Sequence, residues 1–177
     1  AMLQSSWRHA IARSQSRFWG RAPPLHGAVR FFAARRRPAL RQSGGSRARS
    51  IAINKRLTGA RSIEEVIAVW GSQGEDFNGI NYATSISLLG RKRARWRPEL
   101  GSLVEGVSQG LVSGRFNARN IANIAHGLAK MQSVPELPSI LAVIAGEAER
   151  KVVDFTPQAL SNTAWAFATA EVPAPEL

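Results

Sequence analysis

Amide, hydroxyl, basic and aromatic side chains recur in three similar segments of the sequence, at positions spaced four, three and four residues apart. Such spacing places side chains in one row along a helix. Repeated once per unit, groups of this kind can read base edges, stack on bases and meet phosphates, which predicts a surface for single-stranded RNA. The row comprises Ile80, Thr84, Ser87 and Arg91 in the first segment, Arg119, Asn123, His126 and Lys130 in the second, and Gln158, Asn162, Trp165 and Thr169 in the third.

Stacking is the contribution expected of the aromatic members of this row. A base stacked on Trp165, or on His126, would contribute about 1–3 kcal/mol to binding. Each group also has a structural alternative. Asn123 and Asn162 could instead satisfy backbone groups of the neighbouring unit, because buried polar groups need partners. Trp165 could pack between units, and His126 by itself does not indicate a ligand.

A second candidate site is the basic run at residues 91–97, which lies between two expected helices. It holds five of the ten basic residues found from residue 64 onward. Arginine and lysine neutralise phosphates, and an interleaved tryptophan can stack on a base. The alternative is an ordinary solvated loop. The run consists of Arg91, Lys92, Arg93, Arg95 and Arg97, together with Trp96.

Nothing in the sequence indicates an enzyme. There is no cysteine, which excludes thiol nucleophiles, disulfides and cysteine-ligated metals. Two of the three histidines, His9 and His26, lie in the basic N-terminal region, and His126 has no carboxylate near it in the sequence. No glycine-rich phosphate loop or metal-ligand cluster occurs. We therefore expect no catalytic residue, cofactor, metal or small-molecule substrate, and no apolar run is long enough for a membrane span.

The elements that must position the row are helices repeated at a fixed interval. Residues 77–91, 116–130 and 155–169 each open with phenylalanine, and they begin 39 residues apart. An interval of this size is typical of a solenoid, in which each unit buries its apolar face only against its neighbours. The sequence therefore predicts an all-α fold, a right-handed α-solenoid of helix–turn–helix repeats of about 39 residues.

Each segment also carries the signals of a packed helix. Asn78, Asn117 and Thr156 are suitable N-caps, and a Pro-Glu-Leu tripeptide opens each expected second helix. Apolar residues spaced four and three apart predict the buried face, and small residues beside them would admit a close neighbour. The apolar columns are Tyr82, Ile86 and Leu89, then Ile121, Ala125 and Leu128, then Leu160, Ala164 and Phe167. The small columns are Ala83, Ala122 and Ser161, with Gly90, Ala129 and Ala168.

The N-terminal third carries the whole excess of positive charge. Residues 1–63 contain 14 Lys+Arg and no acid, whereas residues 64–177 have a net charge of −2. An Arg-rich, Ser-rich and acid-free N-terminus is typical of an organelle transit peptide. The tetrapeptide at 30–33 resembles a mitochondrial processing site, with cleavage after Phe32. The alternative is a basic arm that is retained and binds RNA.

We expect two parts in the chain. Residues 1–50 are predicted to form the transit peptide and a disordered linker, with the folded part beginning near Ile51. Ser62, followed by Glu64 and Glu65, predicts a helix start, which we interpret as the second helix of an incomplete first unit. The expected array, residues 51–177, is a fragment that consists of a partial unit 51–76, units 77–115 and 116–154, and a truncated unit 155–177.

The segments resemble a known family of repeats. Residues 116–130 and 155–170 share with it an opening phenylalanine, a mid-helix asparagine and a core rich in alanine with tryptophan or leucine. In this respect the chain is similar to the octotricopeptide-repeat proteins of algae and protists. It is also similar to the arrays that precede the RAP domain in FAST-kinase-like proteins. The lead-in at residues 53–57 is similar as well, whereas residues 77–91 depart from the pattern in their core.

That resemblance implies an α-solenoid in mitochondria or plastids that binds single-stranded RNA and acts in transcript processing, stability or translation. The RAP domain has no counterpart in these residues, so the resemblance implies no catalytic residue. We expect a location in the mitochondrial matrix, with the plastid as the alternative. The competing hypothesis is a solenoid that binds proteins, as a scaffold in a mitochondrial ribosome or another assembly. The −2 charge of residues 64–177 favours this competing hypothesis.

Overall fold

The computed structural model describes residues 46–135 and 137–171, and this part of the chain is helical. No β-strand occurs in these residues, which confirms the all-α prediction. The helices are α3 Ser46–Gly59, α4 Ile63–Gln73, α5 Gly79–Arg91, α6 Gly101–Val112, α7 Ala118–Lys130, α8 Leu137–Arg150 and α9 Pro157–Glu171, with 3-10 turns at Gly74–Asp76, Pro98–Leu100 and Val152–Asp154.

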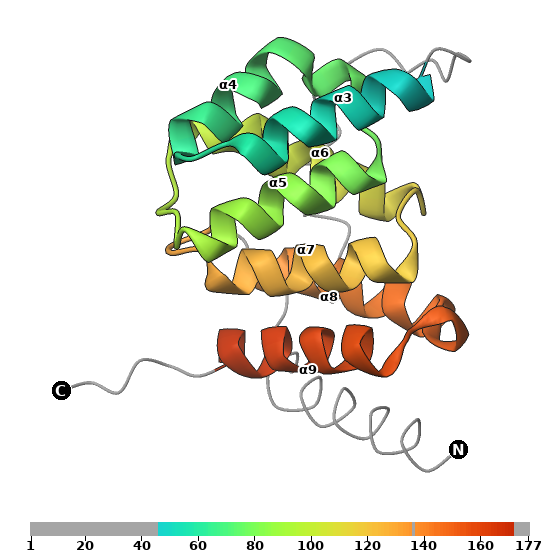
Figure 1. Ribbon diagram of the computed structural model, residues 1–177. Helices are drawn as coiled ribbons and strands as arrows, with labels where there is room; N and C mark the ends of the chain where they lie inside the picture. The colour runs from blue at the N-terminus through green and yellow to red at the C-terminus, as the bar shows by residue number, and fades with distance from the viewer. Residues whose placement is uncertain (1–45, 136, 172–177) are drawn as a thin grey trace, which may run out of the picture. The chain divides into compact units, whose positions relative to one another are not determined.

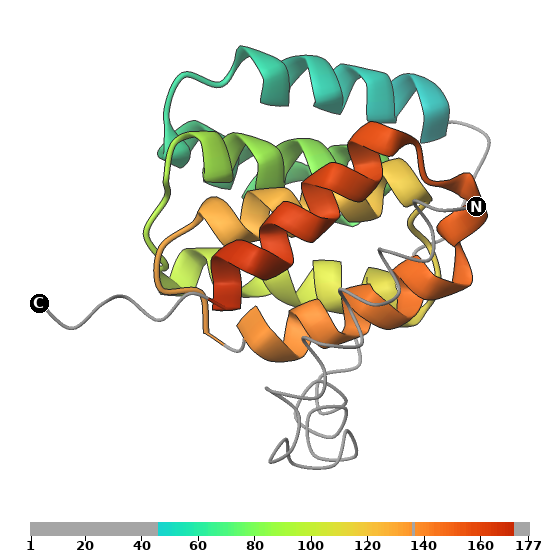
Figure 2. The ribbon, with the colours of Figure 1, turned by 90° about the horizontal axis from the view of Figure 1, so that it is seen from below.

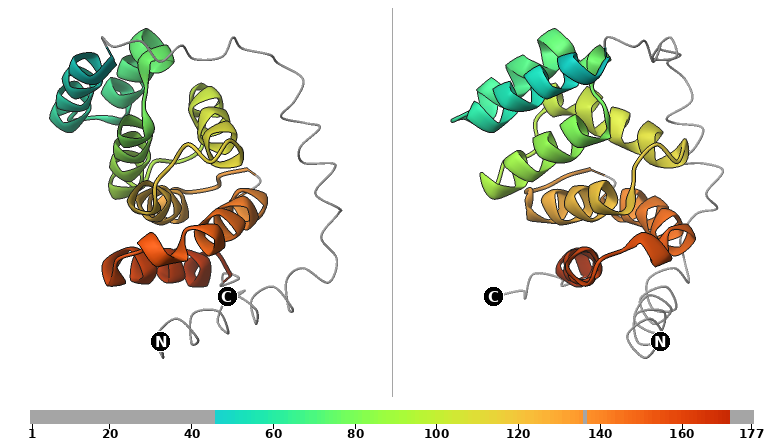
Figure 3. Two further views of the ribbon diagram at one scale, coloured as in Figure 1. Left: turned by 90° about the vertical axis from the view of Figure 1, so that its right-hand side faces the viewer. Right: turned by 45° about the vertical axis from the view of Figure 1, so that its right-hand side comes forward.

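Helices that alternate along the chain lie side by side. α3, α5, α7 and α9 follow one another in a first layer, where α5 and α9 both pack against α7 (Figure 1). α4, α6 and α8 form a second layer behind them, as the turned views show (Figure 3). Seen from the α9 side, α9 lies across α7 (Figure 2). The three segments that carry the candidate row are therefore consecutive helices of the first layer.

The predicted N-caps are confirmed. The Ser62 hydroxyl accepts a hydrogen bond from the backbone N–H of the third residue of α4 at 3.1 Å. Asn78 caps α5 and Asn117 caps α7 in the same way, at 3.1 and 2.9 Å. Thr156 accepts from a backbone N–H in the first turn of α9 at 3.2 Å. Each cap satisfies a donor that a helix start otherwise leaves without a partner.

A buried phenylalanine precedes each of α5, α7 and α9. Phe77, Phe116 and Phe155 are all buried, in extended or turn backbone just before the N-cap. The ring centroids of Phe77 and Phe116 lie 5.5 and 5.8 Å from that of Tyr82. A Cβ on Gly110 of α6 would lie 2.4 Å from the Phe116 ring. The phenylalanine that opens each segment in the sequence thus anchors the turn between the layers.

α5 and α7 touch backbone to backbone near their C-terminal ends. A Cβ on Gly90 would lie 2.5 Å from the carbonyl oxygen of Gly127, and a Cβ on Gly127 would lie 2.6 Å from that of Ile86. Helices this close leave no room for a side chain between them. The expectation of a small residue at Gly90 is confirmed, but its partner Gly127 lies outside the predicted small columns.

The expected apolar columns are buried in α5 and α7 but not in α9. Leu160 and Phe167 are partly exposed and Ala164 is exposed, so the prediction of a buried column in this third segment is wrong. The physical reason is that α6 and α8 of the second layer pack on α5 and α7, whereas no helix after α9 is described. The residues that α9 does bury are Ala159, Thr163 and Ala166.

The folded part begins earlier than expected. α3 starts at Ser46, so the assignment of residues 46–50 to a disordered linker is wrong. α3 buries Ser50, Ile53 and Leu57 at spacings of three and four, which places it as a first-layer helix with α4 as its partner. From residue 46 onward the chain has 15 Lys+Arg and 12 Asp+Glu, a net charge of +3. The value of −2 therefore understates the charge of the folded part.

Two of the expected features fall outside the described residues. These are the transit peptide with its processing site at Phe32 and the second helix expected at Pro175. In the described part, none of the helices combines the length and hydrophobicity that crossing a bilayer requires.

A buried carboxylate holds the turn that leads into α7. Burial raises the pKa of Glu147, but hydrogen bonds and charge from Arg150 and Lys151 outweigh it and hold the pKa below its ordinary value. The Lys151 ammonium also donates to the carbonyls of Gly114 and Phe116, at 2.9 and 2.6 Å. These bonds fix the end of α6 and the start of α7 against α8.

The glycine contact can be tested by adding one methyl group. Gly127→Ala is expected to lower the free energy of unfolding by about 1–3 kcal/mol, because the methyl must displace the backbone of α5. Gly146 in α8 is the matched control, since no atom lies within 4 Å of the position of its Cβ. Gly146→Ala is expected to stabilise the protein by about 1 kcal/mol through helix propensity. Urea denaturation measures both, and equal stabilities for the two variants would contradict the close contact.

Candidate nucleic-acid interface

The candidate row lies on the first layer and is accessible to solvent. Ile80 and Trp165 are 54% and 42% exposed, and every other member is exposed or half-buried. Because α5, α7 and α9 are consecutive neighbours, the row of each helix stands beside that of the next. The structure therefore brings the predicted residues together on one surface. Its polar members are Thr84, Ser87, Arg91, Arg119, Asn123, His126, Lys130, Gln158, Asn162 and Thr169.

The mid-helix asparagines of the row form no side-chain hydrogen bond within the described part. The side chains of Asn123 and Asn162 are half-buried and make no hydrogen bond to any described residue. The contact between the helices at this point involves the backbone, since the Ser87 hydroxyl donates to the carbonyl of Asn123 at 3.5 Å. The alternative in which these amides satisfy a neighbouring backbone therefore finds no support in the geometry.

A different asparagine has that structural role. Asn81 is fully buried, and its side-chain amide donates to the Ser50 carbonyl of α3 at 3.0 Å while its oxygen accepts from the N-cap backbone of α5. Asn120, 39 residues on, is also buried and lies against Gly79 of the preceding first-layer helix. The repetition of asparagine at this interval was a signal in the sequence that could have marked the pair as structural.

Trp165 lies where α9 meets α7, with part of its ring in solvent. The centroids of the Trp165 and His126 rings are 4.8 Å apart at 57°, and the Lys130 ammonium lies 5.5 Å from the centroid of the indole. A cation at this distance is attracted by the ring. The indole thus makes the predicted contact between units and, being 42% exposed, also retains surface on which a base could stack.

Two basic residues of the run at 91–97 bond to a neighbouring part of the structure, and the other three do not. The Lys92 ammonium donates to the Arg61 carbonyl at 2.6 Å, and the Arg97 guanidinium pairs with Glu64 at 3.1 Å. A hydrogen bond to its own backbone, together with Arg97, holds the pKa of Glu64 below the ordinary value. Lys92 therefore bonds to the α3–α4 turn and Arg97 to the first turn of α4, while their assignment as RNA contacts stays a prediction.

The remaining bases of the run point to solvent. Arg91, Arg93 and Arg95 are exposed, and none of them forms an ion pair with a described residue. Trp96 is half-buried, with its indole against Gly101 at the start of α6. A ring held in this way offers less surface for stacking than Trp165 does. The run contributes exposed positive charge rather than an aromatic platform.

Two hydrogen bonds join this loop to the α7–α8 loop. The Trp96 N–H donates to the Gln132 carbonyl at 2.8 Å, and the Gln132 N–H donates to the Ala94 carbonyl at 3.0 Å. Ala94 is fully buried beneath them. This short parallel bridge fixes the loop beside the C-terminal end of α7, close to Lys130 in the chain.

No group of three or more potential metal ligands occurs among the described residues. His126, the candidate histidine, faces an aromatic ring and a lysine rather than a carboxylate. The absence of an enzyme activity remains a prediction from the sequence.

The surroundings of His126 give a pH dependence. Burial, and then the charge of Lys130, lower the pKa of His126 below 6.5. The unfolded chain therefore binds this proton more readily, so stability present above pH 6.5 is lost as the pH falls through the lower, folded pKa. NMR titration is expected to show this depressed pKa, and Lys130→Met to raise it. Arg115→Gln serves as the control, and a wild-type pKa at or above 6.5 would contradict the burial.

Comparison with models of protein families, with curated proteins and with solved structures finds no match to this chain.

Proposed function

We propose that this chain is an organellar RNA-binding helical-repeat protein that acts in transcript processing, stability or translation. The observation that carries the proposal is the row of polar and aromatic side chains that stays accessible on three consecutive helices. Three properties recommend this surface for RNA. It repeats at a fixed interval, its mid-helix amides have no partner in the described part, and an exposed indole lies on it.

The architecture in this proposal is a right-handed α-solenoid with units of about 39 residues. Support comes from equivalent positions: Phe77, Phe116 and Phe155 are each buried before a capped helix. The pair α5 and α6 falls within 77–115, the pair α7 and α8 within 116–154, and α9 opens the next unit. α3 and α4 form a preceding pair.

Charge supports the same proposal. The folded part has a net charge of +3 when α3 is included, so it is not the acidic body that residues 64–177 alone would indicate. Cations of the row, among them Arg119 and Lys130, lie where they could meet phosphates between the bases that the amides contact. The mitochondrial matrix, with the plastid as the alternative, rests on the composition of the N-terminal region.

A protein-binding scaffold is the second candidate. Its support is the exposure of large aliphatic side chains on neighbouring first-layer helices, Ile51 of α3 at 62% and Ile80 of α5 at 54%. Isolated aliphatic residues are common on protein surfaces, so these two carry less weight than a repeated polar row.

Removing the exposed indole tests the RNA proposal. With the full chain and labelled single-stranded RNA of mixed sequence, Trp165→Ala is expected to weaken binding by about 1–3 kcal/mol, since a stacked base loses its platform. Phe167→Ala is the matched control, because Phe167 is an aromatic residue of the same helix that lies outside the row. Its affinity should equal that of the wild type, as measured by fluorescence anisotropy.

Crosslinking separates the two candidates. Irradiation of the wild-type complex should give RNA-linked peptides from α5, α7 and α9. An absence of RNA binding even at low salt would overturn the proposal and favour the scaffold.

A further inference from the structure

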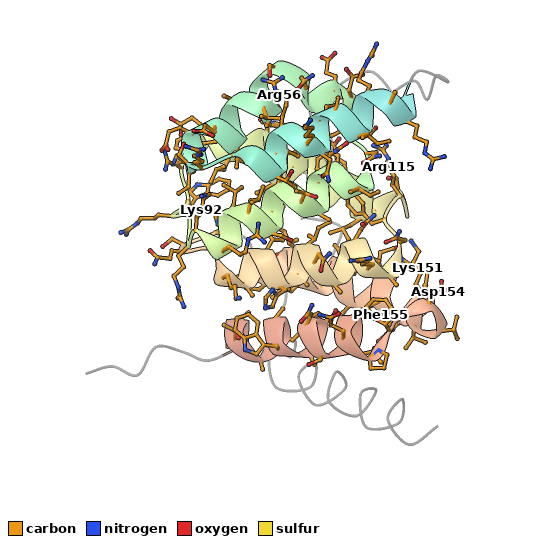
Figure 4. The ribbon with its side chains drawn as sticks, viewed as in Figure 1. Arg56, Lys92, Arg115, Lys151, Asp154 and Phe155 are labelled. Atoms are coloured by element: carbon orange, nitrogen blue, oxygen red, sulfur yellow. The ribbon has the colours of Figure 1, made fainter. Side chains whose placement is uncertain are left out.

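Five basic residues lie at one end of the first layer, four of them exposed arginines and the fifth the half-buried Lys130. Arg91 ends α5 and Lys130 ends α7, while Arg93 and Arg95 lie in the loop after α5 and Arg61 in the turn after α3. We call these five residues the basic strip. Figure 4 shows Lys92 at this end of the layer and Arg115, Lys151 and Asp154 at the other.

The strip is continuous because two sets of contacts join its parts. The bond from Lys92 to the Arg61 carbonyl brings the α3–α4 turn against the loop that carries Arg93. Gln132 lies two residues after Lys130, the last residue of α7. The bridge between Arg95 and Gln132 therefore places Arg95 beside the C-terminal end of α7. Lys130 in turn lies over the indole of Trp165. A path of positive charge therefore crosses three helix ends and reaches the row.

Nearby carboxylates leave most of this charge unbalanced. Glu64 is paired with Arg97, which lies outside the strip, and Glu65 accepts a hydrogen bond from the backbone N–H of Arg61. Glu99, at the start of the α6 segment, is exposed and forms no ion pair with a described residue. The partial negative charge of a helix C-terminus stabilises a basic residue in the last turn, which explains Arg91 in α5 and Lys130 in α7. It does not explain the arginines of the loop.

Arg93 adds an independent observation. Its φ is 47°, in the left-handed region where a side chain costs free energy and glycine does not. Its backbone N–H closes the end of α5 on the Gly90 carbonyl at 3.0 Å, a place where glycine commonly stands. An exposed arginine in this position is less favourable for the backbone than glycine, and it adds a charge that glycine would not.

We infer that the basic strip binds the sugar–phosphate backbone of single-stranded RNA whose bases contact the row. This inference rests on the proposed function and gives each basic residue of this end of the layer a role in it. Arg61, Arg91, Arg93, Arg95 and Lys130 meet phosphates, whereas Lys92 and Arg97 hold the loop in place. The strand passes from the loop over Lys130 to Trp165, where a base stacks on the exposed indole.

A single substitution separates binding from folding. Arg93→Gly relieves the left-handed backbone, so the thermal midpoint is expected to stay the same or rise, while affinity for mixed-sequence RNA falls about two- to fivefold. Ser133→Gly is the matched control, since Ser133 also has a positive φ of 57° but no charge. It should stabilise equally without changing affinity. Wild-type affinity in Arg93→Gly would remove this residue from the strip.

The salt dependence of binding tests the strip as a whole. In the full chain, replacing Arg91, Arg93 and Arg95 by glutamine should reduce the slope of log K against log[salt] by about two, at roughly 0.7 for each phosphate that is no longer neutralised. The control removes the same charge elsewhere, with glutamine at Arg47, Arg49 and Arg115, and should leave the slope nearly unchanged. Residues 1–45 are the same in all three proteins, so differences report the folded part.

The possible outcomes are distinct. Equal reduction of the slope in the two triple variants would overturn the strip but leave RNA binding intact. A wild type that binds no RNA would overturn the proposed function with it. Binding to vesicles of anionic phospholipid, without binding to RNA, would assign the same charges to a membrane surface and overturn both.

Discussion

The backbone contact between Gly90 and Gly127 fixes how α5 and α7 lie together. Two helices that meet without side chains between them cannot slide or rotate without steric overlap. The candidate surface is assembled from these helices, so the separation of Thr84 on one from Asn123 on the other follows from the glycine contact. A reader of bases needs such fixed spacing, because its contacts must match the spacing of successive nucleotides.

Much of the fold was predictable because its signals are local. An asparagine such as Asn78 or Asn117 caps the helix that begins with the next residue, and nothing distant is needed to recognise it. The buried phenylalanines were visible for another reason, their return at an interval of 39 residues. The accessible row was also predictable, since helical geometry places residues three and four apart on one face.

Other features depend on partners that are remote in the sequence. Lys92 bonds to a carbonyl 31 residues earlier, and Arg97 pairs with a carboxylate 33 residues earlier, so the division of the basic loop could not be read from its composition. α3 was placed too late because its first residues are polar and basic. Ser50 is buried there against α5, where Asn81 donates to its carbonyl. Phe167 is partly exposed because no second-layer helix that follows α9 is described, and the spacing of apolar residues in α9 alone gives no sign of this.

The bridge between the two loops has a consequence for motion. The amide protons of Trp96 and Gln132 are each bonded across the boundary between neighbouring helix pairs. Amides in loops usually exchange with solvent quickly, but each of these two must first break a hydrogen bond that crosses this boundary. Their exchange is therefore expected to be slower than that of loop amides without such a bond, and a ligand that spans the boundary would slow both together.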